Sequence, residues 1–549
     1  MERTFLNQQI FEVPQEEVER SEEESLFCTV CPLKRENLEL RCERGYWQEL
    51  HRRAVEREQK RKEQIEQLQA RIHYLEQQLY GRKSEKGNQE PAGRENAESG
   101  KKKRDRGHQK GAPGHAQRSY AHLPVVEEAY DLSAEQKRCP RCGLPVIEFP
   151  GTEDCEELEI EVKAYRRKIR HKRYIPGCRC GMLPGIITAA GPPRLVGKSR
   201  LGISVWAMIL VEKYLYGRPI ARLLESWKSH GMDIAPGTVA DGLKRLLPLF
   251  EPVRQAIEAK SRQDAWWHAD ETTWRVFQMP EGKRSHRWYL WVFVSPSAVV
   301  YILDPGRSAQ VVHQHLGEVE QGTLCVDRYS AYKKFAKDKG GIVLAFCWTH
   351  QRRDFLNVGG SWPDLEDWAM EWVQRIGKVF HLNHERLSQP RDSEGFLQAD
   401  RQLRKALGEM EHVREGELHR QRMDAECISV LKSLKNHWEG LTVFLDQPHI
   451  PMDNSEAERR MRGPALGRKN YYGSVCIWSG HFTATLFGIF QMLLKWNINP
   501  RAWLTEYLTV CAKNGGRPPE DISAFLPWEM PEEERKRLRL TRIRGDPSG

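Results

Sequence analysis

The chain has 549 residues, of which 39% are apolar and 30% are charged, and this length corresponds to three or four domains at roughly 150 residues each. No run approaches the ~18 consecutive apolar residues of a membrane helix, and no charged start leads into an apolar stretch, so the sequence excludes a membrane or secreted protein and predicts a cytoplasmic one. Lys and Arg number 86 against 76 Asp and Glu, and this net charge of +10 favours a polyanionic partner.

The first 82 residues combine an acidic segment with a heptad repeat. Residues 1–45 are acidic and polar, and their cysteines, with one histidine that follows, could hold a metal ion or be ordinary side chains. This possible metal set is Cys28, Cys31, Cys42 and His51. Residues 46–82 carry apolar residues at alternating spacings of three and four, which favours a homodimeric coiled coil over an amphipathic helix docked on its own chain.

A basic linker and a cysteine-rich module come next. Residues 83–120 are rich in Gly, Lys and Arg, and they form either a flexible tether that binds DNA phosphates or a solvated linker. The basic cluster in this segment is Lys101, Lys102, Lys103 and Arg104. Residues 121–190 contain two close cysteine pairs that resemble those of a zinc ribbon. Their four thiolates would hold one structural Zn²⁺. The alternative is a ribbon that binds no metal. The predicted zinc ligands are Cys139, Cys142, Cys178 and Cys180.

Residues 195–262 predict a helical domain, because apolar residues recur there every three or four positions. Two of its helices are separated by a Gly-containing turn, in the manner of a helix–turn–helix. Such a pair could place one helix in a DNA groove, and the same geometry is also common in plain helical packing.

Residues 263–355 predict three antiparallel strands followed by strands that alternate with helices. The expected strands are 266–277, 287–294, 299–303, 323–327 and 342–346. This order is that of a ribonuclease-H-like α/β sheet, in which the first and fourth strands are neighbours. Asp270, in the first strand, and Asp327, at the end of the fourth, would then converge on one spot.

Residues 446–500 complete this predicted core and supply a third carboxylate. Asp453 and Glu456 have the spacing of a capping box with Asp453 as the N-cap, which leaves Glu458 as the candidate metal ligand. Two Asp and one Glu form an oxygen-only set, which favours Mg²⁺ or Mn²⁺. Two such ions could drive phosphoryl transfer with water or a 3′-hydroxyl. The alternative is that each carboxylate is a helix cap or an ion-pair partner.

Basic side chains accompany these carboxylates and suit phosphate contacts. The candidate DNA contacts are His350, Arg352, Arg353, Arg459, Arg462, Arg468 and Lys469. The group at 350–353 is expected at a strand end, where it either positions phosphates or packs as a cluster. Residues 356–445 are expected to form a helical insertion that either contacts DNA or forms a dimer surface. Residues 501–549 are expected to form a C-terminal segment with a basic tail.

Several motifs of this chain together resemble the IS66 family of insertion-sequence transposases. They are LYGRKSEK at 79–86, HADET at 268–272, VDRYSAY at 326–332, CWTHQRR at 347–353 and DNSEAER at 453–459. The resemblance implies a DDE transposase with Asp270, Asp327 and Glu458 as the metal ligands, and it favours Glu458 over Glu456. It also implies a bacterial, nucleoid-associated protein whose partners are transposon-end and target DNA and accessory proteins encoded alongside.

The predicted function is therefore DNA cleavage and strand transfer at the inverted-repeat ends of an insertion sequence. One rival is a ribonuclease-H-fold nuclease that cuts without strand transfer. The other is a non-catalytic DNA-binding protein derived from a transposase.

Overall fold

The protein is described by a computed structural model that covers part of the chain. The described residues are 40–41, 44–45, 47–48, 51–53, 55–59, 61–62, 125, 131–133, 136–138, 140–145, 164–175, 186–197, 199–281, 285–420 and 423–540. The chain divides into two units, one made of Met1–Glu95 with Phe355–Glu371 and the other of Asn96–Asp354 with Trp372–Gly549. In the first unit, the described residues between 40 and 62 are helical and exposed, and the rings of Phe355 and Trp368 lie 5.6 Å apart.

Several predicted features lie outside the described residues. They are the heptad positions 65–79, the basic cluster 101–104 and most of the cysteines of both predicted metal sites. Of these cysteines the structure describes only Cys142, whose thiol is exposed, and it describes His51 in an exposed helical stretch. The coiled coil and the zinc ribbon therefore stay predictions.

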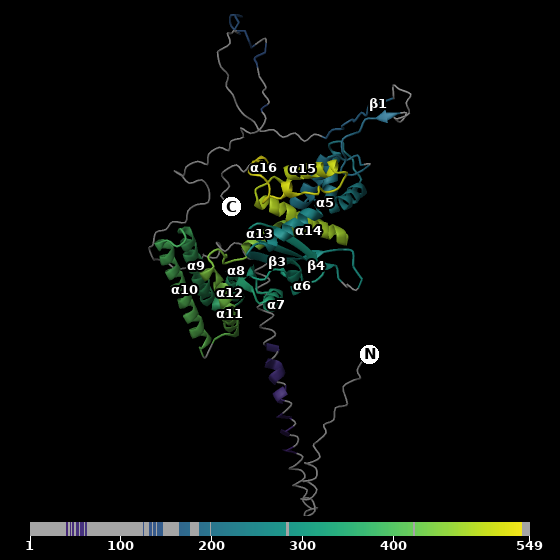
Figure 1. Ribbon diagram of the computed structural model, residues 1–549. Helices are drawn as coiled ribbons and strands as arrows, with labels where there is room; N and C mark the ends of the chain where they lie inside the picture. The colour runs from purple at the N-terminus through teal and green to yellow at the C-terminus, as the bar shows by residue number, and fades with distance from the viewer. Residues whose placement is uncertain are drawn as a thin grey trace, which may run out of the picture. The chain divides into compact units, whose positions relative to one another are not determined.

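A five-stranded mixed sheet forms the centre of the second unit (Figure 1). Its order is β5-β4-β3-β6-β7, with β3, β4 and β5 antiparallel and with β6 and β7 parallel to β3. The strands are β3 (Trp266–Arg275), β4 (Arg287–Val294), β5 (Val299–Asp304), β6 (Gly322–Val326) and β7 (Ile342–Phe346). Aromatic and β-branched residues dominate β4 and β5, which are largely buried. All five predicted strands, and the pairing of the first with the fourth, are confirmed.

Helices cover both faces of this sheet. On one face lie α13 (Ser455–Tyr471) and α14 (Ile477–Lys495), and the ring of Phe487 in α14 contacts Trp274 of β3 and Tyr301 of β5. On the other face lie α6 (Ala309–Leu316) and α7 (Ser330–Lys339), where Tyr332 contacts Trp291 of β4. Because side chains alternate between the faces of a strand, Asp270 lies on the α13 face and Glu271 lies on the α7 face.

The helix α14 is long and apolar enough to cross a membrane, by length and composition alone. Among the described residues it is the single helix that meets this test, and most of its apolar window is buried. It packs on β5 and on α5 (Pro236–Arg262), with Phe482 against the ring of Phe250. Its position between the sheet and a helix layer accounts for its apolar composition.

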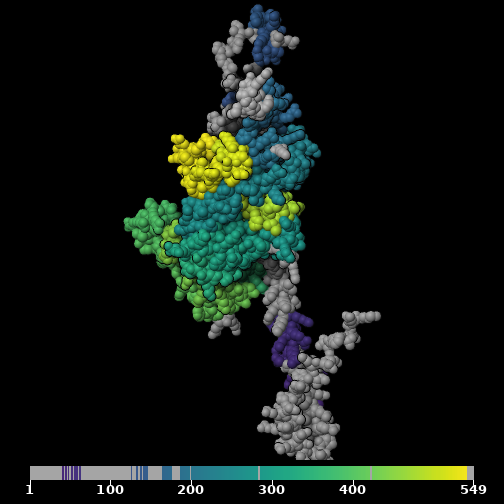
Figure 2. Space-filling model, turned by 45° about the vertical axis from the view of Figure 1, so that its right-hand side comes forward, coloured from purple at the N-terminus to yellow at the C-terminus, as the bar shows by residue number. Residues whose placement is uncertain are grey.

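The helices that precede the sheet pack with the helices that end the chain (Figures 1 and 2). The leading set is α3 (Ile203–Leu210), a π-helical turn η3 (Val211–Leu215), α4 (Ile220–Lys228) and α5. The closing set is α15 (Pro500–Lys513), η5 (Ser523–Phe525) and α16 (Glu532–Arg537). Tyr507 of α15 donates a hydrogen bond to the carbonyl of Leu249 in α5. The predicted helices of 195–262 are confirmed, including the helix, turn and helix formed by α4 and α5.

The stretch between β7 and α13 is helical, as predicted. Its helices are α8 (Trp348–Ser361), η4 (Pro363–Leu365), α9 (Glu366–Ser388), α10 (Glu394–Leu418), α11 (Ala425–Asn436) and α12 (Trp438–Asp446). Arg386 of α9 is fully buried and donates to Asp400 of α10 and to the carbonyl of Phe444 in α12. This buried guanidinium joins three helices of the insertion.

Helix α5 approaches α3 closely at Gly242, where an added Cβ would lie only 1.9 Å from the buried ring of Trp206. We expect Gly242→Ala to lower the free energy of unfolding by about 1–3 kcal/mol through overpacking. Gly237 in the same helix has no atom within 4 Å of such a Cβ, so Gly237→Ala should be neutral or stabilise by up to about 1 kcal/mol. Chemical denaturation of both variants tests this contact, and equal stability of the two would contradict it.

Candidate active site

Asp270 and Asp327 lie level with each other on neighbouring parallel strands. The paired residues of β3 and β6 include His268 with Cys325, and Asp270 and Asp327 each lie two positions further along. Asp327 directly follows β6, so it continues the same register two residues beyond the last pair. Adjacent strands are about 4.8 Å apart. The sheet thus brings together the two aspartates that the sequence singled out.

Glu458 comes from the first turns of α13, which packs on β3. The predicted capping box at this helix is wrong: the N-cap is Asn454, and the Asp453 carboxylate accepts from the Ser455 N–H at 2.9 Å. The Glu456 carboxylate instead forms ion pairs with Arg459, at 2.8 Å, and with Arg460, at 2.7 Å. The two arginines, one turn further along α13, bind different oxygens of this carboxylate, which gives Glu456 a structural role.

The three carboxylates influence one another electrostatically. The pKa of Asp270 is raised to about 7, first by burial and then by the neighbouring negative charges of Glu271, Asp327 and Glu458. Within the described part of the chain, none of the three forms an ion pair with Lys or Arg. The nearest basic group is His350, whose Nε2 lies 3.8 Å from Oε1 of Glu458. Burial lowers the pKa of His350, so it does not compensate this negative charge at neutral pH.

The neighbouring Glu271 has two side-chain partners, although burial still raises its pKa. Its side chain is 2% exposed, one oxygen accepts from Arg307 Nε at 2.8 Å, and the other accepts from the Tyr332 hydroxyl. Arg307 is 41% exposed and lies over the ring of Tyr329 at 4.0 Å, within electrostatic reach of Asp327. Sequence analysis missed this group, because Arg307 lies 36 positions from Glu271 and no local motif links them.

The donor atoms of the three carboxylates match the type that a divalent cation prefers. Among the residues that the structure describes, no group of three or more His, Cys, Asp or Glu side chains converges tightly enough to hold a metal ion. Asp270 and Asp327 each turn one oxygen to a backbone N–H of their own segment, at 2.9 Å, and their other oxygens accept no hydrogen bond from described residues. Three oxygen ligands without a cationic partner fit Mg²⁺ or Mn²⁺ by donor type.

His350 lies in the first turn of α8, which begins just after the end of β7. The backbone N–H of Trp348 donates to the carbonyl of Met452, and α8 begins there directly after β7. Nδ1 of His350 is buried and has no hydrogen-bond partner among the described residues. Arg352 is half-buried and Arg353 is exposed on the same turns of α8.

The basic residues of α13 divide into two groups. Arg459, Arg462 and Lys469 are exposed, and their spacings of three and seven positions place them along one side of the helix. Arg468 is bound within the protein, where it donates to the hydroxyls of Thr272 and Thr273 in β3 at 3.1 and 2.9 Å. The exposed stripe begins one residue after Glu458, so it leads away from the carboxylates along the helix surface.

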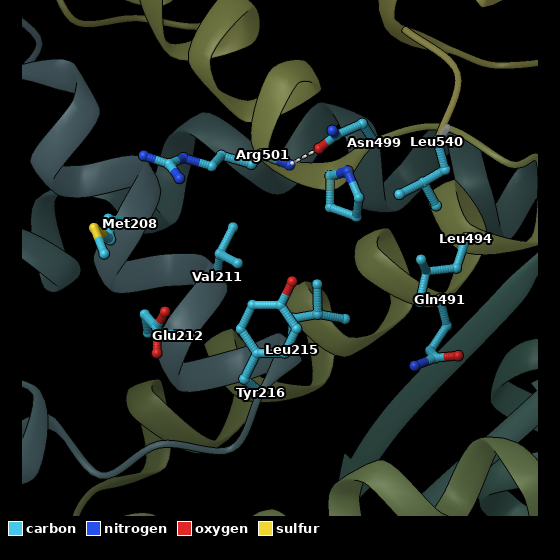
Figure 3. A pocket seen from close by; sticks show the side chains of 11 residues that line it. Met208, Val211, Glu212, Leu215, Tyr216, Gln491, Leu494, Asn499, Arg501 and Leu540 are labelled. Carbon is cyan, nitrogen blue, oxygen red and sulfur yellow. Dashed lines mark hydrogen bonds between the residues drawn. The ribbon is translucent and has the colours of Figure 1, made fainter. Parts of the chain in front are cut away.

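A hollow of about 500 Å³ lies between η3, α14 and α15 (Figure 3). Its lining is Met208, Val211, Glu212, Leu215, Tyr216, Gln491, Leu494, Asn499, Pro500, Arg501 and Leu540. It includes none of the three carboxylates, so it is separate from the candidate active site.

Comparison with known proteins identifies the family. A family model described as "Transposase IS66 family" matches residues 198–481. The chain is 27% identical over 434 residues to "Uncharacterized protein y4jD" and 26% identical over 430 residues to "Uncharacterized protein y4qI", both of Sinorhizobium fredii (strain NBRC 101917 / NGR234). These matches cover 75% of this chain, 82% of the first relative and 76% of the second.

A solved structure, "Mos1 transposase paired-end complex with left transposon end", is similar at 13% identity over 46% of this chain and 79% of that chain. Its TM-score of 0.11 is too low to support an argument about fold or function. The family match, by contrast, spans more than half of the 549 residues and includes all three carboxylates of the site. The chain belongs to the IS66 family of transposases.

Proposed function

We propose that this transposase cleaves DNA at the inverted-repeat ends of an insertion sequence and transfers the freed 3′-ends to target DNA. The observation that carries the proposal is the set of Asp270, Asp327 and Glu458, three half-buried carboxylates without a Lys or Arg partner among the described residues. Buried charge without compensation is costly. Such a set is expected where a cation and a phosphodiester complete the site.

Asp270, Asp327 and Glu458 would hold two Mg²⁺ or Mn²⁺ ions. The chemistry that such ions supply is activation of water or a 3′-hydroxyl and stabilisation of the leaving oxygen in an in-line displacement. The chain itself positions the carboxylates: Asp270 is in β3, Asp327 directly follows the neighbouring strand β6, and Glu458 is in a helix that packs against β3. Glu271 would stay outside the metal site, because its carboxylate already accepts from Arg307 and from the Tyr332 hydroxyl on the other face of the sheet.

The DNA backbone would follow the exposed side of α13. Arg459, Arg462 and Lys469 begin beside Glu458 and extend along the helix, which spans 1.5 Å per residue, so they cover about 15 Å. Contacts of this kind bind phosphates without reading sequence. His350, Arg352 and Arg353 lie in the turns of α8 that follow β7, where they would contact phosphate near the cleaved bond. Arg468 would act indirectly, since it holds α13 to β3.

The remaining modules complete the proposal. The sheet with its two helix layers would be a ribonuclease-H-like core, and the pair α4 and α5 would contact DNA as a helix–turn–helix. The zinc ribbon and the basic linker would add DNA contacts, and the coiled coil would join two chains. Accessory proteins encoded alongside would act with the bacterial, cytoplasmic complex.

The test is a reaction of the full-length protein with a supercoiled plasmid that carries the gene's own flanking ends, together with target DNA and the accessory proteins. With Mg²⁺ we expect 3′-end cleavage at the element boundaries and covalent joining to the target, and with chelator we expect neither. Cleavage without joined products would favour the nuclease alternative. Mobility shift of the ends without either product would favour a non-catalytic DNA-binding protein.

A further inference from the structure

We propose that Asn454 is a positioning residue that sets the place of Glu458 relative to Asp270. This inference rests on the proposed function, because it concerns the geometry of the same carboxylates. Asn454 does not belong to the triad, and it would not touch substrate or metal.

Four contacts of Asn454 join three separate parts of the chain. Its Oδ1 lies 2.9 Å from Nδ1 of His268, and its Nδ2 donates to the carbonyl of Ala269 at 2.7 Å. Its backbone N–H donates to the Cys347 thiol at 3.2 Å, and its backbone carbonyl accepts from the Glu458 N–H at 3.2 Å. Ala269 directly precedes Asp270, so one side chain bonds the strand of Asp270 while its backbone bonds Glu458.

The hydrogen bonds of Asn454 are buried, and the donor and acceptor of each are determined. Asn454 is 1% exposed and His268 is 3% exposed, so water does not replace these bonds. Because the carbonyl of Ala269 can only accept, the amide nitrogen of Asn454 faces it and the amide oxygen faces His268. Nδ1 of His268 must then carry a proton and donate, whatever the charge of the ring. The geometry thus requires an amide at 454, since it needs a donor and an acceptor.

The position of this network explains why it bears on metal affinity. The N-cap residue determines where α13 begins, and Glu458 lies in the turn that follows. The bonds from Asn454 to His268 and Ala269 hold the start of α13 to β3, whereas Arg468 holds α13 to β3 farther along the helix. Residues that orient metal ligands typically change metal affinity or activity by about 10- to 100-fold when they are mutated.

The experiment measures Mn²⁺ binding by calorimetry, and thermal unfolding, on the full-length protein. Asn454→Ala and Asn454→Asp are expected to weaken Mn²⁺ binding by about 10-fold or more. The aspartate keeps the acceptor for His268 but turns an oxygen toward the Ala269 carbonyl. Asn454→Asp should therefore not restore Mn²⁺ binding. The matched control is Asn499→Ala, since the Asn499 side chain accepts from the backbone N–H groups of Arg501 and Ala502 in its own helix. This control should lower the melting temperature and leave Mn²⁺ affinity unchanged.

A second pair of variants keeps the test decisive if Asn454→Ala does not fold. His268→Ala removes the donor to Asn454, whereas His268→Asn places an amide donor near the position of Nδ1. Mn²⁺ binding should weaken in His268→Ala and return toward wild type in His268→Asn. Wild-type affinity in a folded Asn454→Ala protein, or equal affinity in the two His268 variants, would overturn the inference.

The Mn²⁺ measurements distinguish loss of the proposed role of Asn454 from loss of the proposed metal site. If Asp270→Ala abolishes Mn²⁺ binding while the Asn454 and His268 variants keep it, the carboxylate site stands and Asn454 is only a packing residue. If neither wild type nor Asn499→Ala shows Mn²⁺ binding that depends on Asp270, the metal site itself is refuted and the role of Asn454 falls with it.

Discussion

Replacing any one of Asp270, Asp327 and Glu458 by its neutral amide is expected to lower the rates of DNA cleavage and strand transfer on the order of 1,000-fold or more. Metal-ion catalysis supplies several kcal/mol of transition-state stabilisation, and each ~1.4 kcal/mol changes the rate tenfold. Each amide keeps the shape of the side chain and removes an anionic oxygen ligand. The measurement is a gel assay of cleaved and joined products from element-end DNA with Mg²⁺, at equal amounts of folded protein.

The matched control for Glu458→Gln is Glu456→Gln, two residues earlier in the same helix. Glu456 pairs with Arg459, which is 61% exposed, and with Arg460. Loss of the exposed Arg459 pair costs about 0–1 kcal/mol. The Arg460 pair is only 18% and 22% exposed, so its loss costs more stability. Neither pair involves one of the three carboxylates, so at equal amounts of folded protein this variant should keep most activity. An inactive Glu456→Gln beside an active Glu458→Gln would show that the other glutamate is the ligand. Full activity in all three amide variants would refute the proposed site.

The sheet could be predicted from the sequence because its signals are local and strong. The segment RWYLWVFV at 287–294 is apolar and aromatic throughout, as expected of a strand that helices cover on both faces. Once the order of strands and helices was read, the pairing of the first strand with the fourth followed from topology. The convergence of Asp270 and Asp327 could therefore be expected from the sequence alone.

Interactions between distant parts of the chain could not be predicted in this way. The capping-box prediction used only the spacing of Asp453 and Glu456, whereas the helix start is fixed by bonds from Asn454 to β3, 185 and 186 positions away. The start of α8 likewise depends on a bond from Trp348 to Met452. Local patterns give the type of an element, and tertiary contacts decide its ends.

Burial of Asp270, together with the neighbouring carboxylates, affects stability as well as activity. The pKa of Asp270 is about 7 in the folded protein, against an ordinary value of 3.8. Well below pH 3.8 the carboxyl is protonated in both the folded and the unfolded state, so it does not change the free energy of unfolding. Between pH 4 and 7 the folded state retains a proton that the unfolded state has released. The free energy of unfolding therefore falls as pH rises through this range. Above pH 7 the carboxyl is ionised in both states, and the full loss of stability applies.

The variant Asp270→Asn is therefore expected to stabilise the protein at pH 8 in the absence of divalent cations while it abolishes activity. At ~1.4 kcal/mol per pKa unit, the difference corresponds to roughly 4 kcal/mol as an upper value, since relaxation and partial exposure reduce it. Chemical denaturation of wild type and variant at pH 5 and pH 8, followed by Trp fluorescence, measures the effect. The advantage of the variant should be larger at pH 8, and excess Mn²⁺ should stabilise wild type alone. An advantage that does not change with pH would contradict this account, because the penalty exists only while Asp270 is ionised in the fold.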